Sequence, residues 1–177
     1  MTMTKTMMTL AACLALVTGP ALAHGPVRLK TEQTVTLDAP VEEVWDVIGH
    51  FDDMSWFPGV ASVEATGTEK GATRVRTMED GQVVEEELLK LQSEKHAIST
   101  LMLETNLDVV KATNYASHIT LKDVDGKTEL DWKGAFYRGF PQNEPPADLN
   151  DDAAIASVEA LHQTGIDALT ARFGKVE

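Results

Sequence analysis

Three charged residues near the middle of the chain have the side chains best suited to chemistry. Arg74 and Arg76 alternate along one predicted strand, and Glu86 lies in phase with the apolar residues of the next strand. Asp80-Gly81 is a strong hairpin signal between these strands, so Arg74 and Glu86 can pair across the concave face of a sheet. A buried carboxylate needs such a partner, because an unpaired buried charge is strongly destabilising. Two interpretations remain: a structural ion pair, or a polar site that binds a ligand or transfers a proton.

Apolar and aromatic side chains are predicted to line a cavity beside this pair. Trp132 and Phe136 share one face of a later strand with Gly134, where a backbone or a ligand could approach closely. His162 neighbours the apolar stripe of the last predicted helix and could reach the same space. The sequence does not decide whether the cavity is open or filled by its own side chains. The complete predicted ligand-binding set is Arg74, Glu86, Met102, Tyr115, Trp132, Phe136 and His162.

The chain lacks the usual signatures of a catalytic or metal centre. There is no phosphate-binding loop, dinucleotide fingerprint or ordered nucleophile, base and acid. No two histidines have a metal-binding spacing such as His-x-x-x-His. An N-terminal His24 could chelate copper through its amino group and imidazole, but the sequence offers no second histidine for it, and a frayed terminus is the simpler interpretation. We therefore assign no catalytic residue, metal or cofactor.

The elements that must position these residues are strands followed by a long helix. Strands are predicted over 27–37, 60–68, 72–78, 82–91, 96–104, 114–124 and 128–137. Two short helical segments, 41–49 and 51–57, follow the first strand, and a helix of about six turns covers 151–173. This order predicts an α+β fold in which a curved antiparallel sheet of about seven strands wraps around the last helix.

The last helix carries two stripes at helical spacing. The apolar stripe consists of Ile155, Val158, Leu161, Gly165/Ile166, Leu169 and Phe173, and it requires a broad cover. The second stripe contains only small residues, namely Ala153, Ser157, Ala160, Thr164, Ala168 and Ala171. Small residues would permit either close packing of the helix on the sheet or a thin wall beside a ligand cavity.

Net charge limits the classes of partner. The chain has 177 residues and a formal charge of −13 at pH 7. This balance disfavours nucleic acid and anionic membrane surfaces, and it favours partners that present a basic patch.

The first residues resemble a secretory signal peptide. Lys5 provides the positive region, residues 7–17 form an apolar run, and Ala21-Leu22-Ala23 is a small-x-small cleavage site. We expect residues 1–23 to be removed in export to the periplasm, leaving a single domain over 24–177. The apolar run is too short to span a bilayer. An alternative is lipidation at Cys13, because residues 10–13 resemble a lipobox.

The segment LDAPVEEVWDVIGHFDDMSWFPGV, residues 37–60, resembles the opening of the START-like (SRPBCC, Bet v 1-type) superfamily, in its polyketide cyclase/dehydrase-like branch. The segments GATRVRTMEDG, VVEEELLKL and NYASHITLKDVDGKTELDWKGAF follow in the order of that family. The resemblance covers about residues 29–173. It implies a helix-grip fold, and with it either carriage of a hydrophobic small molecule or lipid, or a cyclase- or dehydratase-like enzyme.

A narrower resemblance is to the MxaD group within this superfamily. It is carried by the expected start His24-Gly25-Pro26 and by WKGAFYR, NEPPADLNDDAA and TGIDALTARF. It implies a non-enzymatic periplasmic accessory protein of methanol or alcohol oxidation, which promotes the interaction of a quinoprotein dehydrogenase with its c-type cytochrome. Docking on such a partner is predicted to use Glu144 and Asp148 in the loop before the last helix, and also Trp56 and Phe57. If exposed, this Trp-Phe pair could instead form a lid over the cavity, and if turned inward it is part of the core.

Overall fold

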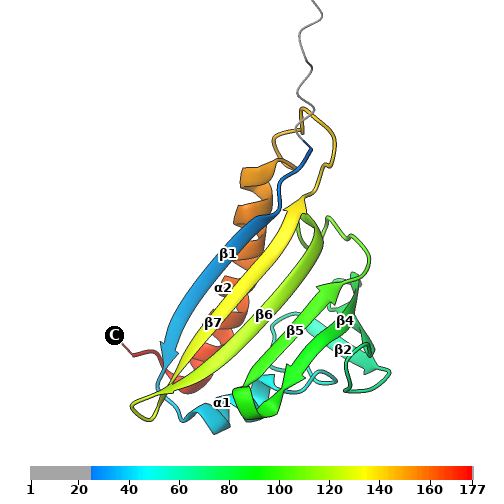
Figure 1. Ribbon diagram of the computed structural model, residues 1–177. Helices are drawn as coiled ribbons and strands as arrows, with labels where there is room; N and C mark the ends of the chain where they lie inside the picture. Colours follow the sequence, from blue (N-terminus) through cyan, green and yellow to red (C-terminus); the bar gives the residue numbers. More distant parts are fainter. Residues whose placement is uncertain (1–24, 177) are drawn as a thin grey trace, which may run out of the picture.

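A curved antiparallel sheet and one long helix form the framework of the protein (Figure 1). The structure is a computed structural model that describes residues 25–176, so the predicted signal peptide, Cys13 and His24 lie outside the described residues. The sheet order is β1-β7-β6-β5-β4-β3-β2. The strands are β1 Leu29–Leu37, β2 Val60–Ala65, β3 Thr73–Met78, β4 Val83–Gln92, β5 Ala97–Met102, β6 Ala112–Val124 and β7 Lys127–Arg138. The predicted α+β helix-grip architecture is confirmed.

Helix α1, Val41–Ile48, follows β1 directly. Pro40 occupies its N-cap position, Glu42 and Glu43 lie at the positive end of the helix dipole, and Gly49 ends the helix. Its apolar residues, including Trp45 and Ile48, are buried against the sheet. A single turn of 3₁₀ helix, η1 Ser93–Lys95, separates β4 from β5.

The predicted second short helix over 51–57 is wrong, because this segment forms consecutive turns. The Asp53 carboxylate accepts a 2.7 Å hydrogen bond from the backbone N–H of Ser55, and such side-chain contacts compete with a helical backbone. Pro58 then prevents continuation. The segment instead forms a loop that returns to the core through Phe51, Met54 and Phe57.

Helix α2, Asp151–Phe173, lies against β1, β7 and β6. The Asn150 side chain caps it by accepting a 2.9 Å bond from the N–H of Ala153, and Gly174 ends it with a φ of 81°. The buried residues are Ala154, Val158, His162, Gly165, Ile166 and Leu169. Most of the apolar stripe is therefore buried, but Ile155 and Leu161 are only half-buried.

Neither interpretation of the small-residue stripe is correct. Ala160, Thr164 and Ala171 are exposed, and the other three members are half-buried. The stripe thus lies on the outer side of α2. Close approach to the sheet depends instead on two glycines: a Cβ on Gly165 would lie 2.6 Å from the Trp132 ring, and one on Gly134 would lie 2.9 Å from Val158.

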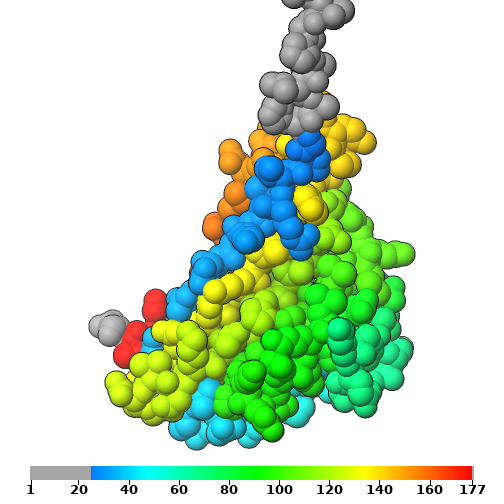
Figure 2. Space-filling view, in the orientation of Figure 1, coloured from blue at the N-terminus to red at the C-terminus, as the bar shows by residue number. Residues whose placement is uncertain are grey.

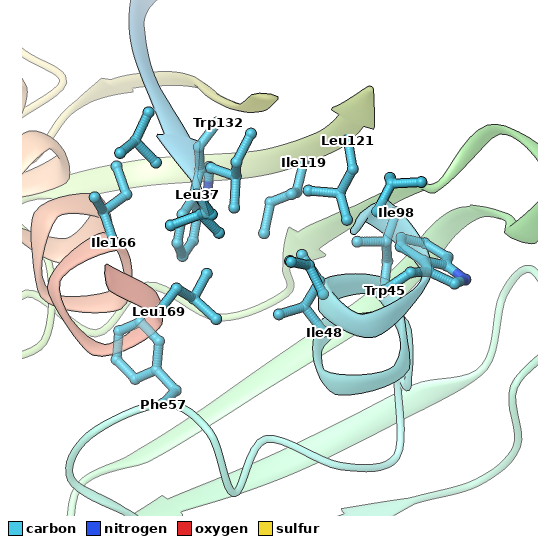
Figure 3. Close-up of a cluster of buried hydrophobic side chains, with 14 of the residues drawn as sticks. Leu37, Trp45, Ile48, Phe57, Ile98, Ile119, Leu121, Trp132, Ile166 and Leu169 are labelled. Carbon is cyan, nitrogen blue, oxygen red and sulfur yellow. The ribbon is translucent and has the colours of Figure 1, made fainter. Parts of the chain in front are cut away.

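The buried side chains form two clusters along the concave face of the sheet. Figure 3 shows the larger one, where Ile166 and Leu169 of α2 lie on the side of Trp132, and Trp45 and Ile48 of α1 lie on the side of Ile98. The smaller cluster surrounds Phe136 near the start of α2 and includes Val84, Met102, Val110, Ala112, Tyr115, Ala154 and Val158. Among the described residues, no helix is both long and apolar enough to cross a lipid bilayer.

Candidate functional site

The β3–β4 hairpin brings three charged side chains together on the concave face. The strand register pairs Arg74 with Glu86, as the sequence predicted. Arg74 donates from Nε to Oε2 of Glu86 at 2.8 Å and from Nη1 to the carbonyl of Phe51 at 2.9 Å. Arg76 places its own Nε 2.8 Å from the same Glu86 oxygen. All three residues are at least 94% buried, so the charges interact in an environment of low polarity.

The charges of this Arg74–Glu86–Arg76 triad do not cancel. Burial raises the pKa of Glu86, but the guanidinium groups of Arg76 and Arg74 outweigh burial and hold that pKa below its usual range. Burial lowers the pKa of Arg74, and the Glu86 carboxylate opposes the shift. With Glu86 ionised, two cations face one anion. The triad therefore carries one net positive charge in the protein interior.

A second polar cluster joins α2 to the sheet. The hydroxyl of Tyr115 on β6 lies 2.7 Å from Nε2 of His162 on α2, and both side chains are buried. Trp132 of β7 stacks on the His162 ring with centroids 4.7 Å apart, and its indole N–H donates to Ser117 at 2.9 Å. The His162 Nδ1 atom has no hydrogen-bond partner within residues 25–176.

Burial lowers the pKa of His162 to about 4, which predicts acid sensitivity of the fold. The unfolded chain binds a proton near pH 6.5 but the native protein does not, so the free energy of unfolding should fall as pH drops from about 6.5 to about 4. The loss attributable to this group should reach about 2–3 kcal/mol. Urea denaturation at successive pH values measures it. His162→Gln should be less sensitive across this window, and an unchanged pH dependence would contradict the assignment.

A small cavity of about 50 Å³ lies between the triad and Trp132. Its polar lining consists of Arg74, Arg76, Glu86, Thr100, Tyr115, Ser117 and His50, and its apolar lining of Ile48, Met54, Trp56, Phe57, Ile98, Ile119, Trp132 and Leu161. Half-buried Trp56 and exposed His50 lie where the lining meets solvent. The volume suits a few water molecules or a very small ligand.

Only part of the predicted ligand-binding set lines this cavity. Arg74, Glu86, Tyr115 and Trp132 do so, whereas Met102 and Phe136 belong to the separate cluster near the start of α2. His162 lies behind Tyr115 and Trp132. The prediction left out Arg76 and Ser117, although both are two residues along the strand from a member of the set and so share its face.

The predicted docking residues divide into buried and exposed ones. Phe57 is only 5% exposed and packs against Gly165 and the edge of Trp56, so its assignment as a docking residue is wrong. Trp56 is half-buried, with its ring centroid 6.1 Å from that of Trp132. Glu144 and Asp148 are exposed. Figure 2 shows their loop, in yellow to orange, at the end of the molecule where the described chain begins.

Within residues 25–176, no three or more His, Cys, Asp or Glu side chains are grouped so that they could hold a metal ion.

Comparisons with known proteins agree with this architecture. A family model described as polyketide cyclase/dehydrase and lipid transport matches residues 28–174. The protein XoxI from Bacillus cereus is 22% identical, with 81% of this chain and 94% of that chain covered and a TM-score of 0.68. A protein from Nitrosospira multiformis is 25% identical over 82% and 96% of the chains (TM-score 0.65), and the Zhui aromatase/cyclase from Streptomyces sp. R1128 is 20% identical over 82% and 93% (TM-score 0.61). No functionally curated protein matches the sequence.

Proposed function

This chain belongs to the polyketide cyclase/dehydrase and lipid transport family, and we propose that it acts as an accessory protein rather than as an enzyme or a lipid carrier. It is a non-enzymatic accessory protein of methanol or alcohol oxidation in the periplasm. It docks on a quinoprotein dehydrogenase or its c-type cytochrome and promotes their interaction. The sequence likeness of its C-terminal third to the MxaD group supports this role, and the loop between β7 and α2 provides a docking surface.

The observation that carries the proposal is that this loop is held in place while its acids remain exposed. Arg138 donates to the carbonyls of Phe140 at 2.8 Å and Gln142 at 2.9 Å, and it forms an ion pair with Asp151 at 3.3 Å. Backbone bonds from Phe140 to Leu149 and from Leu149 to Pro146 close the loop. A loop fixed in this way loses little conformational entropy on binding, and its charges can steer a basic partner.

A simpler interpretation is that the acids only favour the start of α2. The structure separates the residues that do so from the rest: Asn150 caps the helix, and Asp151 and Asp152 lie in its first turn. Glu144 and Asp148 precede the helix, and among the described residues neither forms an ion pair with a basic side chain. Helix stabilisation therefore does not account for these two acids, and both can contact a partner.

Reversing these two charges should strongly reduce stimulation of electron transfer. The protein with Glu144→Lys and Asp148→Lys is added to a purified quinoprotein dehydrogenase and its c-type cytochrome, and methanol-dependent cytochrome reduction is followed spectrophotometrically. We expect stimulation by the wild type to exceed that by the variant by about tenfold at low salt, with the difference shrinking as salt rises.

The matched control is Glu64→Lys with Glu94→Lys, which makes the same charge change at exposed acids on β2 and η1. It should retain nearly full stimulation. A second variant, Arg74→Met with Arg76→Met and Glu86→Leu, removes the whole buried triad without leaving an unpaired charge. Loss of stimulation in this folded cavity variant but not in the loop variant would replace the docking role by ligand carriage or catalysis.

Periplasmic location is part of the same proposal. The positive residue, apolar run and Ala21-Leu22-Ala23 site support export with cleavage after Ala23. Mass spectrometry of the protein recovered from the periplasm should find an N-terminus at His24. A lipidated Cys13 at the N-terminus would contradict a freely diffusing accessory protein.

Small-molecule binding is the second candidate function, and the cavity beside the triad is the observation that favours it. Its volume of about 50 Å³ is far below the size of ordinary ligand pockets. A lipid or a polyketide-sized substrate for a cyclase or dehydratase would have to displace Trp56 or Trp132. Small-molecule binding therefore ranks second.

A further inference from the structure

The cavity beside the triad is lined by more hydrogen-bond donors than acceptors. Oε2 of Glu86 lies 2.8 Å from Nε of both arginines, so one carboxylate oxygen faces two cations, and only Arg74 donates a hydrogen bond to it. Arg74 also donates to the Phe51 carbonyl. Arg76 has no such second acceptor among the described residues. Its Nε atom lies 2.8 Å from the Glu86 oxygen, but the N–H bond does not point at that oxygen and so forms no hydrogen bond with it. The side chain is only 5% exposed, so only water inside the cavity can replace the missing acceptor.

The hydroxyl groups in the cavity add further donors. Ser117 Oγ accepts from the Trp132 indole and lies within hydrogen-bonding reach of the Tyr115 hydroxyl. We assign the His162 proton to Nε2, because an unpaired acceptor at buried Nδ1 is less unfavourable than an unpaired donor. His162 then donates to the Tyr115 oxygen, so the Tyr115 and Ser117 hydroxyls together keep at least one proton that can be donated into the cavity. Both hydroxyl residues line the cavity together with Arg76.

From this donor excess and the uncompensated positive charge, we infer that the cavity binds a short-chain aliphatic carboxylate, with its oxygens on Arg76 and the Tyr115 hydroxyl. A guanidinium group and a carboxylate form strong, charge-assisted hydrogen bonds, and the ligand would bring the net charge of the site to zero. The alkyl part would contact Trp132 and Ile119. The small volume restricts the ligand to about two to four carbons. The inference concerns the cavity alone and does not depend on the docking role.

Titration of the purified protein with sodium propionate, acetate and butyrate tests this inference, with sodium chloride holding the ionic strength constant. Binding is followed by fluorescence of the cavity tryptophans and checked by calorimetry. We expect saturable binding with a Kd on the order of 1 mM for the best of the three. Propionamide, which has a similar shape but no charge, should bind at least about tenfold more weakly. Equal binding of the amide, or no saturable binding of any of the three carboxylates, would overturn the inference.

Two variants locate the site. Arg76→Met leaves the Arg74–Glu86 pair intact and neutral overall, so the protein should fold and bind propionate at least about tenfold more weakly. Arg28→Met makes the same change at an exposed arginine that forms no ion pair within residues 25–176, and it should bind like the wild type. Unchanged binding by folded Arg76→Met would overturn the inference. Should that variant fail to fold, Tyr115→Phe decides: about fivefold weaker binding supports the site, and unaltered affinity refutes it.

No dehydrogenase or cytochrome is present in this titration, so its failure leaves the docking role standing. Conversely, loss of stimulation in the loop variant would leave carboxylate binding unaffected.

Discussion

Replacing Trp132 by alanine should reduce the free energy of unfolding by about 3–5 kcal/mol, as deletion of large aromatic side chains from cores usually does. Trp132 is 5% exposed and stacks on His162. Its ring also packs against α2 at Gly165, where any side chain would collide with it. Its removal also leaves Ser117 without the indole donor. Urea denaturation followed by circular dichroism measures the change, because far-ultraviolet dichroism does not depend on the deleted fluorophore.

Trp56→Ala is the matched control for this substitution. Trp56 is half-buried at the rim of the cavity, and within the described residues its indole N–H forms no hydrogen bond with another residue. Its removal should therefore be less than half as destabilising. If Trp132→Ala lost less than about 1 kcal/mol, the core would be loosely packed there and the helix would not depend on this contact.

Replacing Glu86 by glutamine should destabilise the protein by about 3–5 kcal/mol, because it removes the anion between two buried cations. Glutamine has the same shape, so the effect isolates the charge. Arg74 and Arg76 would then repel each other with no opposite charge to offset the cost of their burial. The free energy of unfolding at neutral pH provides the measurement.

An exposed ion pair supplies the control. Glu129→Gln breaks the pair with Lys122, whose side chain is 60% exposed, and should change stability by less than about 1 kcal/mol. The triple substitution of Arg74, Glu86 and Arg76 by methionine, leucine and methionine should be much less harmful than Glu86→Gln alone. A Glu86→Gln protein as stable as the wild type would mean that water or another group compensates the two arginines.

The Arg74–Glu86 contact could be predicted because strand geometry is local and periodic. The Asp80-Gly81 turn sets the register of the hairpin, and alternation then places both residues on one face. The same alternation placed Met102 and Phe136 on the correct face but could not give their position along it. They lie in the cluster near the start of α2, away from the triad. Which cluster a residue of the concave face joins depends on where the helix crosses the sheet, and alternation does not specify this.

Features that depend on long-range packing were not predictable in the same way. The pattern of α2 contains an apolar and a small stripe, and the sequence alone did not show that the small one faces outward. Glycines at 134 and 165, one on each packing partner, determine the line of closest approach. Likewise, Phe57 lies next to Pro58 in a loop, and its burial follows from contacts with α2, which is about a hundred residues away. Local propensity carries no information on such contacts.

The docking role is tested most directly by measuring the affinity of the purified protein for the dehydrogenase and for the cytochrome separately, over a range of salt concentrations. The proposed function predicts that one of them binds and that its Kd rises with salt. It further predicts that the variant with Glu144→Lys and Asp148→Lys binds at least about tenfold more weakly while the variant with Glu64→Lys and Glu94→Lys binds normally. Binding to neither protein at low salt, or equal binding by both variants, would contradict it.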